Sequence, residues 1–281
     1  MSITGAAMVA GIVGRPVVQS LSPVLHNAWI AAMGLNAAYV PLAPTASGFV
    51  ALVEGLRGGV IRGVNVTMPF KEEALAVADD RSERARLAGA ANLLLFRQDG
   101  RIFADNTDGL GLLGAVAVQA PGFDPSSGPV VILGAGGAAR GAAAALSLAG
   151  APDIRIVNRT AARAEALARD IGGVVRAVDA IDALSDAALI VNATALGLGG
   201  GAGPEIDLAR APATVVVMDM VYKPLRTAFL VRAAAQGLRT VDGLEMLIQQ
   251  AVPSFEAFFG QAPSEAVDVR ALALAAIGET A

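Results

Sequence analysis

Short apolar runs alternate with segments of helical spacing along most of the chain. In the second part, beyond residue 129, each run is bounded by polar or glycine-rich residues. These runs predict strands at residues 130–133, 154–157, 174–176, 189–192, 215–219 and 239–241. Strands that alternate with helices are typical of right-handed βαβ units. We therefore expect a parallel sheet with helices packed on it in this part of the chain.

The first part of the chain has a less regular pattern. Apolar runs predict strands at residues 8–13, 38–41 and 63–66, and helical spacing predicts helices at 23–33, 47–57, 71–78 and 109–118. Residues 90–96 and 101–104 flank Asp99-Gly100, which is a good signal for a β-hairpin. Further helices are predicted at 244–259 and 267–276. We place the main domain boundary near Asp108, before the helix that starts at residue 109.

Composition excludes several classes of protein. The 281 residues are 54% hydrophobic and 16% charged, so the chain can bury a large core and is not disordered. It has no cysteine and a single histidine, His26, which argues against disulfides, a metal centre and a Ser-His-Asp triad. We look for the catalytic acid or base among Lys, Asp, Glu and Tyr.

Charge and hydropathy bear on location and partners. The net charge of −4 argues against a nucleic-acid surface, and no apolar run reaches the roughly 18 residues of a membrane helix. Residues 1–5 lack the basic start of a signal peptide. We expect a cytoplasmic protein with no metal, no nucleic-acid partner and no membrane span.

A glycine-rich loop follows the strand at 130–133. It reads Gly134-Ala135-Gly136-Gly137-Ala138 and leads into an alanine-rich helical stretch. Gly134 allows a tight turn, Gly136 allows the backbone to approach a pyrophosphate, and the helix N-terminus attracts negative charge. The alternative is a plain structural turn. Because a strand, a loop, a helix and a second strand follow one another here, we favour a dinucleotide site.

The end of the next strand indicates which dinucleotide is bound. It reads Asn158-Arg159-Thr160, with Arg163 one turn further on. NAD sites place an acidic residue about here, whereas an arginine accommodates the 2′-phosphate of NADP. The alternative is a solvated helix start with Thr160 as its N-cap. Because no acidic residue ends this strand, we predict NADP(H).

The first part carries polar clusters at its chain turns. In Ser20-Leu21-Ser22-Pro23, the proline is expected to keep Ser22 extended, so that two hydroxyls point the same way and grip one anionic group. A simpler interpretation makes a serine the N-cap of the following helix. Taken alone, the sequence favours that simpler interpretation.

Two further clusters hold ionisable residues. In the segment from Asn65 to Lys71, the lysine starts a helix, where it opposes the helix macrodipole and its pKa is expected to fall. The alternative is an exposed surface lysine. In the segment 105–109, Asp108 either caps the next helix or serves a site, and the ligand pattern of a calcium loop is missing.

Taken together, these segments resemble the shikimate dehydrogenase family over nearly the whole chain. The resemblance is carried by strings in the family's order: Gly14-x-Pro16, Ser20-x-Ser22-Pro23-x-x-His26-Asn27, Asn65-Val66-Thr67-x-Pro69-x-Lys71, Gly89-Ala90-x-Asn92, Asn106-Thr107-Asp108-x-x-Gly111, Gly134-x-Gly136-Gly137-Ala138, Asn158-Arg159-Thr160-x-x-Arg163, Asn192-Ala193-Thr194, Asp219-Met220-Val221-Tyr222-x-Pro224 and Gly243-Leu244-x-Met246-Leu247 with Gln250.

The resemblance implies a fold with two α/β domains and a cleft between them. A substrate-binding domain, 1–108, is completed by C-terminal helices 244–281, and a Rossmann-type NADP-binding domain spans 109–243. The implied activity is NADPH-dependent, reversible reduction of 3-dehydroshikimate to shikimate, in the biosynthesis of chorismate and aromatic amino acids. The resemblance leaves open a monomer or a homodimer.

The resemblance also implies roles for single residues. Lys71 and Asp108 would be the catalytic pair. Ser20, Ser22, Thr67, Asn92, Tyr222 and Gln250 would bind the substrate, with the serines on its carboxylate. The cofactor would be held by Gly134, Ala135, Gly136, Gly137, Ala138, Asn158, Arg159, Thr160, Arg163, Thr194 and Gly243.

Two positions depart from the family pattern. Leu93 stands where the family usually has threonine, and Ala195 stands where serine is frequent. Leu93 removes a hydroxyl next to a substrate residue, so quinate and aminoshikimate remain alternative substrates. The absence of an acidic residue near Arg159 favours shikimate and NADP. A non-catalytic NADP-binding sensor is a further alternative, and the presence of Lys71 and Asp108 argues against it.

Overall fold

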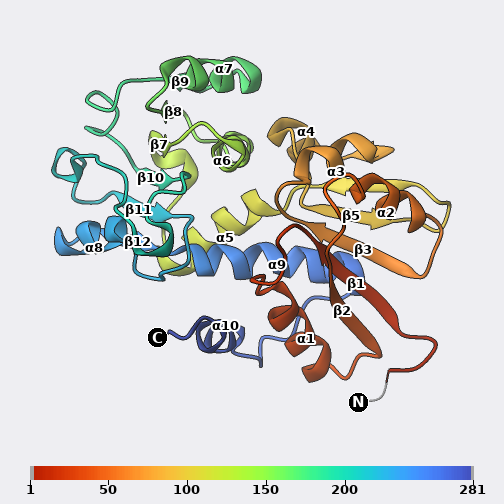
Figure 1. The fold of residues 1–281 in the computed structure, drawn as a ribbon. Coiled ribbons are helices and arrows are strands. Elements are labelled where there is room, and N and C mark those ends of the chain that lie inside the picture. The colour runs from red at the N-terminus through yellow and green to blue at the C-terminus, as the bar shows by residue number, and fades with distance from the viewer. Residues whose placement is uncertain (1–2, 280–281) are drawn as a thin grey trace. The chain divides into compact units, whose positions relative to one another are not determined.

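The computed structural model describes residues 3–279, so Met1 and Ser2 of the N-terminal segment considered above lie outside it. The chain forms two compact α/β units (Figure 1). Unit 1 contains the residues up to Thr107 together with those from Gln250 onward, and unit 2 is Asp108–Gln249. Within residues 3–279, no helix is both long and apolar enough to cross a bilayer.

Unit 1 is built on a mixed six-stranded sheet. Its strand order is β2 (Ala37–Leu42), β1 (Met8–Val13), β3 (Ile61–Val66), β5 (Leu93–Phe96), β6 (Ile102–Asp105) and β4 (Asp80–Arg81). β1 pairs in parallel with β2 and β3. β5 and β6 pair antiparallel on either side of Asp99-Gly100, so the predicted hairpin is confirmed.

The helices of unit 1 are short. They are α1 (Ser22–Ala32), α2 (Phe49–Gly55), α3 (Lys71–Val77) and α4 (Glu83–Ala88). Sequence periodicity did not predict α4, whose ends are set by caps. Ser82 accepts the amide of Ala85 at the N-terminus, and Gly89 ends the helix with φ +64°. Two turns are too short for an apolar stripe to develop, and the capping residues therefore carry the local signal.

Unit 2 is a fully parallel six-stranded sheet, as predicted. Its strand order is β12 (Arg239–Val241), β11 (Val216–Asp219), β10 (Leu189–Asn192), β7 (Val130–Leu133), β8 (Ile154–Val157) and β9 (Val175–Ala177). Its helices are α5 (Asp108–Gln119), α6 (Gly137–Leu148), α7 (Ala161–Ile171) and α8 (Ala228–Ala235).

Both faces of the central strand β7 are buried, which explains why β7 is apolar throughout. In β7, Val130 and Ile132 pack in one core with α5, α6 and α7, while Val131 and Leu133 pack in another with α8. Alternate residues of a strand point to opposite faces, so helices on both sides favour apolar residues at every position of β7.

Two helices complete the chain. α9 (Gly243–Phe259) contains the division between the units, since Gln249 belongs to unit 2 and Gln250 to unit 1. α10 (Val269–Ile277) follows it, ending at Gly278 with φ +76°. Because α9 is a continuous helix through the division, the second half of α9 supplies unit 1 with side chains from late in the sequence.

Candidate functional site

The two serines near the N-terminus do not lie in an extended segment, so that prediction is wrong. Leu21 has helical backbone angles, φ −83° and ψ −11°, and Ser22 is the first residue of α1. The oxygen Oγ of Ser20 accepts the amide of Ser22 at 3.3 Å. Proline is tolerated in the first helical turn because its missing N–H is one that the helix cannot satisfy. Ser22 is therefore held by backbone turn geometry and is 4% exposed.

Tyr39 of β2 is a buried polar residue that the sequence did not single out. The Tyr39 hydroxyl donates to Oδ1 of Asn65 at 2.8 Å. Burial raises the pKa of Tyr39 well above its usual value. The phenol is therefore a neutral donor. No local motif marks Tyr39, because its partners are distant in sequence.

A buried polar network joins four chain segments in unit 1. Asn92 Oδ1 accepts the Thr107 amide at 2.7 Å, and Asn92 Nδ2 lies 3.0 Å from Thr107 Oγ1 and 3.3 Å from Gln250 Oε1. Asn65 Nδ2 donates to the Asn92 carbonyl at 3.1 Å and to Ser254 Oγ at 2.9 Å. Thus Asn92 and Gln250, predicted as substrate residues, lie together, and Ser254 is a member that the sequence did not reveal.

Thr67 and Lys71 follow the end of β3. The Thr67 amide donates to the Val13 carbonyl at 2.9 Å, and a Cβ on Gly14 would collide with the Thr67 methyl group. Gly14 thus leaves the space that the Thr67 side chain fills. Lys71 begins α3, is half-buried, and its carbonyl accepts the Ala91 amide at 2.8 Å. This backbone hydrogen bond therefore connects Lys71 to Ala91, the residue before Asn92.

Asp108 is the first residue of α5 and directly follows Thr107 in the chain. The buried side chain of Thr107 is 0% exposed and is held by Asn92. The Asn92–Thr107 bond therefore fixes the backbone from which Asp108 emerges.

The glycine loop of unit 2 has the geometry of an anion-binding helix start. Gly134 has φ +114°, and a Cβ there would lie 3.0 Å from the Thr194 methyl. Gly136 and Gly137 have open space where a Cβ would lie, and both are exposed. α6 begins after Gly136 without a side-chain cap, so its first amides face that space. These residues fit the pyrophosphate of a dinucleotide.

The arginines predicted to bind a 2′-phosphate lie just beyond β8. Arg159 and Arg163 are exposed, the first directly before the N-cap of α7 and the second in its first turn. Asn158 Nδ2 donates to the Thr160 carbonyl at 2.9 Å, which shapes this turn. Thr160 occupies the N-cap position without making a side-chain cap. The exposed guanidinium groups suit a phosphate approaching from solvent.

A buried carboxylate orders the loops after β10 and β11. Asp219 is 0% exposed and accepts from Asn192 Nδ2 at 2.9 Å, the Val221 amide at 3.0 Å and Thr227 Oγ1 at 2.6 Å. Burial raises its pKa above the ordinary range. Asn192 in turn accepts the Thr194 hydroxyl at 2.7 Å. One carboxylate therefore determines where Thr194 lies beside the glycine loop.

Gly243, at the start of α9, packs against the two residues that precede Tyr222. A Cβ on Gly243 would lie 2.5 Å from the Met220 carbonyl oxygen and 2.8 Å from the Val221 carbonyl carbon, so only glycine fits at the start of α9. Tyr222, the next residue after Val221, is half-buried, and burial raises its pKa. This close approach brings the start of α9 against the segment that carries Tyr222.

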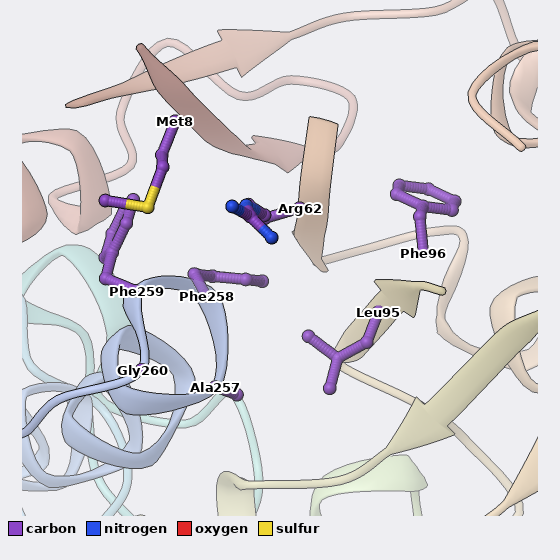
Figure 2. A pocket seen from close by; sticks show the side chains of 8 residues that line it. All are labelled: Met8, Arg62, Leu95, Phe96, Ala257, Phe258, Phe259 and Gly260. Atoms are coloured by element: carbon purple, nitrogen blue, oxygen red, sulfur yellow. The ribbon is translucent and has the colours of Figure 1, made fainter. Parts of the chain in front are cut away.

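A separate hollow in unit 1 contains none of the predicted site residues (Figure 2). It is lined by Met8, Arg62, Leu95, Phe96, Ala257, Phe258, Phe259 and Gly260. Figure 2 shows the Arg62 side chain of β3 extending toward the side of the hollow where Met8, Phe258 and Phe259 lie. One exposed charge in an apolar hollow does not define a chemistry, and we assign it no function.

In the described part of the chain, no group of three His, Asp or Glu side chains is arranged to hold a metal ion. The polar network of unit 1 and the glycine loop of unit 2 are typical of an α/β protein that combines a polar small-molecule site with a Rossmann-type dinucleotide site.

Comparisons with known proteins agree with this class. Three family models match the chain: the shikimate dehydrogenase substrate binding domain at residues 12–94, shikimate/quinate 5-dehydrogenase at 119–197, and the shikimate 5′-dehydrogenase C-terminal domain at 243–273. The chain belongs to the shikimate dehydrogenase family.

Individual relatives cover nearly the whole chain. The shikimate dehydrogenase (NADP(+)) of Caulobacter vibrioides NA1000 is 66% identical over 281 residues, 99% of both chains. The shikimate 5-dehydrogenase of Thermus thermophilus, solved with NADP(H) and shikimate, is 36% identical with TM-score 0.84, covering 96% of this chain and 98% of that one. Quinate dehydrogenase from Corynebacterium glutamicum, solved with NAD, is 30% identical with TM-score 0.84, covering 95% and 97%.

Proposed function

We propose that this protein catalyses the reversible, NADP-dependent interconversion of shikimate and 3-dehydroshikimate. The observation that carries the proposal is the buried cluster of Asn92, Thr107 and Gln250, in a chain with a dinucleotide-type glycine loop. The 66% identity to an enzyme named shikimate dehydrogenase (NADP(+)) supports the choice of substrate and cofactor.

The substrate is a cyclic acid that carries several hydroxyls, and it needs two kinds of contact. We assign Ser20 and Ser22 to the carboxylate, because hydroxyls donate to a charged acceptor with strong hydrogen bonds. We assign Thr67, Asn92, Asp108 and Gln250 to the ring hydroxyls, because amide and carboxylate groups suit a donor–acceptor hydroxyl. Tyr222 completes the set near the carboxylate or the nicotinamide.

The cofactor site is assigned to unit 2. The amides of residues 134–138 receive the pyrophosphate, and Asn158, Arg159, Thr160 and Arg163 receive the adenosine 2′-phosphate. Thr194 and Gly243 border the nicotinamide side of the site. Bound NADPH supplies the hydride that reduces the ketone carbon.

Lys71 is assigned the proton transfer. Reduction of a ketone places negative charge on its oxygen, and a positioned proton donor contributes about 10²–10⁴-fold to such a step. The Lys71 ammonium donates a proton from Nζ to this oxygen in reduction, and the neutral amine takes the proton from the hydroxyl in oxidation. We assign Asp108 to orient Lys71 and to accept a hydrogen bond from the neighbouring hydroxyl.

The decisive experiment combines a substrate panel with one variant. The wild-type protein is assayed with shikimate, quinate and aminoshikimate, each with NADP+ and NAD+, and the highest kcat/KM is expected for shikimate with NADP+. Lys71→Ala is expected to lower kcat by about two to four orders of magnitude while the Kd for NADP+ stays within about twofold. Lys223→Ala, at the chain's other lysine, is the matched control and keeps wild-type turnover.

The other outcomes identify the alternatives. A higher kcat/KM for quinate or aminoshikimate assigns the chain to that relative, for which Leu93 in place of the family's threonine is the sequence reason. NADP+ binding without turnover of any of the three acids indicates a sensor. Unchanged turnover in Lys71→Ala removes Lys71 from proton transfer.

We also propose that the enzyme acts in the cytoplasm as a monomer or a homodimer. Cell fractionation and sedimentation of the purified protein test these two statements directly.

A further inference from the structure

We propose that Ser254 is a positioning residue for the substrate ring: its buried hydroxyl fixes the separation of the Asn92 and Gln250 amides that receive the ring hydroxyls. The inference rests on the proposed function, in which those two amides bind the ring. Ser254 lies outside the motifs that carry the family resemblance and is 0% exposed. Three features support the inference: the direction of its hydrogen bonds, the length of the direct contact between the two amides, and the proline that precedes it in α9.

The direction of the hydrogen bonds follows from a backbone carbonyl. Asn65 Nδ2 lies 3.1 Å from the Asn92 carbonyl oxygen, which can only accept, so this end of the Asn65 amide must be the donor. The second proton of the same nitrogen points to Ser254 Oγ at 2.9 Å. Ser254 therefore accepts from Asn65 and donates its own proton to the Gln250 carbonyl at 3.2 Å. Its oxygen also lies 3.4 Å from Thr107 Oγ1.

These bonds connect the two substrate amides through their backbones. Asn65 donates one amide proton to the Asn92 carbonyl and the other to Ser254. Ser254 donates in turn to the carbonyl of Gln250, which lies on the same face of α9. One buried hydroxyl therefore sets where the Asn92 backbone lies relative to the turn of α9 that carries Gln250.

The direct contact between the two side chains is too long to set their separation. Asn92 Nδ2 lies 3.3 Å from Gln250 Oε1, beyond the range of about 2.7–3.2 Å that is typical of an N–H···O hydrogen bond. The bond from Asn65 to Ser254, at 2.9 Å, lies within that range. A glutamine side chain also loses much rotamer entropy when it is held in one position. The anchored backbones therefore determine the space that the ring hydroxyls must fit.

The turn of α9 that carries Gln250 also contains a proline. Pro253 lies inside the helix and has no N–H, so it cannot donate to the carbonyl of Gln249 as another residue would. Ser254, the next residue, donates from its side chain to the next carbonyl, that of Gln250. Serine in a helix can make this bond to the carbonyl one turn earlier. The hydroxyl thus holds the Gln250 carbonyl at the place where the proline leaves the helix with one bond fewer.

The test is Ser254→Ala, which removes the hydroxyl and little volume. Poorer positioning of the ring weakens the bound substrate and the transition state alike. We therefore expect the KM and the directly measured Kd for shikimate to rise roughly three- to tenfold, the effect of losing about one ordinary hydrogen bond. We expect kcat to stay within about twofold and the KM for NADP+ to stay unchanged. Ser254→Thr keeps a hydroxyl that can bond to Gln250, and its Kd should stay within about twofold of wild type.

Val53→Ala is the matched control for stability. Val53 is 0% exposed and packs with Phe49 and Phe70 in the apolar core of unit 1, away from the polar network. Its cavity should lower the free energy of unfolding in urea by an amount comparable to Ser254→Ala, while the KM for shikimate stays at the wild-type value. A loss of folded protein alone lowers the apparent kcat and leaves KM unchanged, so the control separates positioning from stability.

The inference is overturned if Ser254→Ala leaves the Kd for shikimate unchanged, if Ser254→Thr weakens binding as much as alanine does, or if Val53→Ala raises the Kd equally. The proposed function fails in a different way, when the wild-type protein does not turn over shikimate. Normal binding by Ser254→Ala, in a protein whose wild type turns shikimate over, removes only the role of Ser254.

Discussion

Asn92 holds Thr107 with both ends of its amide: Oδ1 accepts the Thr107 amide at 2.7 Å, and Nδ2 lies 3.0 Å from Thr107 Oγ1. Thr107 is completely buried and directly precedes Asp108. The same asparagine therefore has two proposed tasks, a contact with a ring hydroxyl and the support of the backbone that carries Asp108.

Asn92→Ala is expected to lower kcat/KM for shikimate by at least about 100-fold, because both tasks are lost. It should also lower the free energy of unfolding by about 1–3 kcal/mol, because buried donors and acceptors lose their partners. Steady-state kinetics and urea unfolding measure the two effects. Asn36→Ala, a change of amide near the surface of the same unit, is the control. A variant that keeps wild-type kcat/KM contradicts both tasks.

The two glycines of the cofactor loop should respond differently to the same change. Gly134→Ala forces an L side chain to φ +114° with a methyl group 3.0 Å away, so we expect a loss of about 1–3 kcal/mol of stability. Gly136→Ala meets open space at φ −97° and should fold normally. Its methyl group would occupy the space proposed for the pyrophosphate, so the Kd for NADP+ should rise about tenfold or more. Thermal melts and calorimetric titration with NADP+ distinguish the two, and equal behaviour would contradict the assignment.

Arg159 is expected to decide between the two nicotinamide cofactors. Arg159→Asp replaces a guanidinium with a carboxylate that repels the 2′-phosphate, so the KM for NADPH should rise at least about tenfold more than the KM for NADH. Arg210→Asp, the same change of charge elsewhere in unit 2, is the control. Equal increases for both cofactors would mean that the 2′-phosphate is bound elsewhere.

The carboxylate of Asp219 should be replaceable by an amide but not by a methyl group. In Asp219→Asn, the amide oxygen can still accept from Asn192 and Val221, and the amide nitrogen can donate to the Thr227 hydroxyl. Asp219→Ala leaves three buried donors without a partner and is expected to cost about 2–4 kcal/mol. The alanine variant should also raise the KM for NADP+, because Asn192 anchors Thr194. Two variants with the same stability would show that the carboxylate does not order these loops.

The single histidine predicts a specific pH dependence of stability. Burial lowers the pKa of His26 from 6.5 to about 3, and neither ring nitrogen has a hydrogen-bond partner among the residues that the structure describes. Below pH 6.5 the unfolded chain takes up a proton that the folded protein does not, so stability falls with falling pH until about pH 3. The expected loss between pH 7 and pH 5 is roughly 2 kcal/mol.

His26→Phe keeps an aromatic ring against Tyr39 and removes the titrating group. Urea unfolding at pH 7, 6 and 5 should show that the variant no longer loses stability over this range. Carboxylates such as Asp153 and Asp186 also have lowered pKa values. Because carboxylates take up protons at lower pH than histidine, they change the free energy of unfolding below the range from pH 7 to pH 5. The same slope in both proteins would show that His26 does not cause it.

Sequence patterns predicted unit 2 better than unit 1, and the reason is burial. Strands covered on both faces are mostly apolar, so β7, β10 and β11 are visible as apolar runs, the last two ending in Asn192 and Asp219. In β8 the run is broken by Arg155, which is paired with Asp153 and Asp186. In unit 1, β4 has two residues and α4 has six, too few for a period to show. The extended conformation expected at Ser22 was wrong, because the tendency of proline to oppose a helix before it was outweighed by the turn that Ser20 and Ser22 form.

By itself, the sequence determined the family, the parallel sheet of unit 2 and the glycine-rich loop after β7, because each depends on short motifs of residues that are close together in the chain. Only the tertiary structure decided that Tyr39 meets Asn65 across 26 residues and that Ser254 meets Asn65 across 189. The physical reason is that a hydrogen bond requires two groups within about 3 Å in a suitable orientation, and for distant residues that geometry is set by the packing of whole elements.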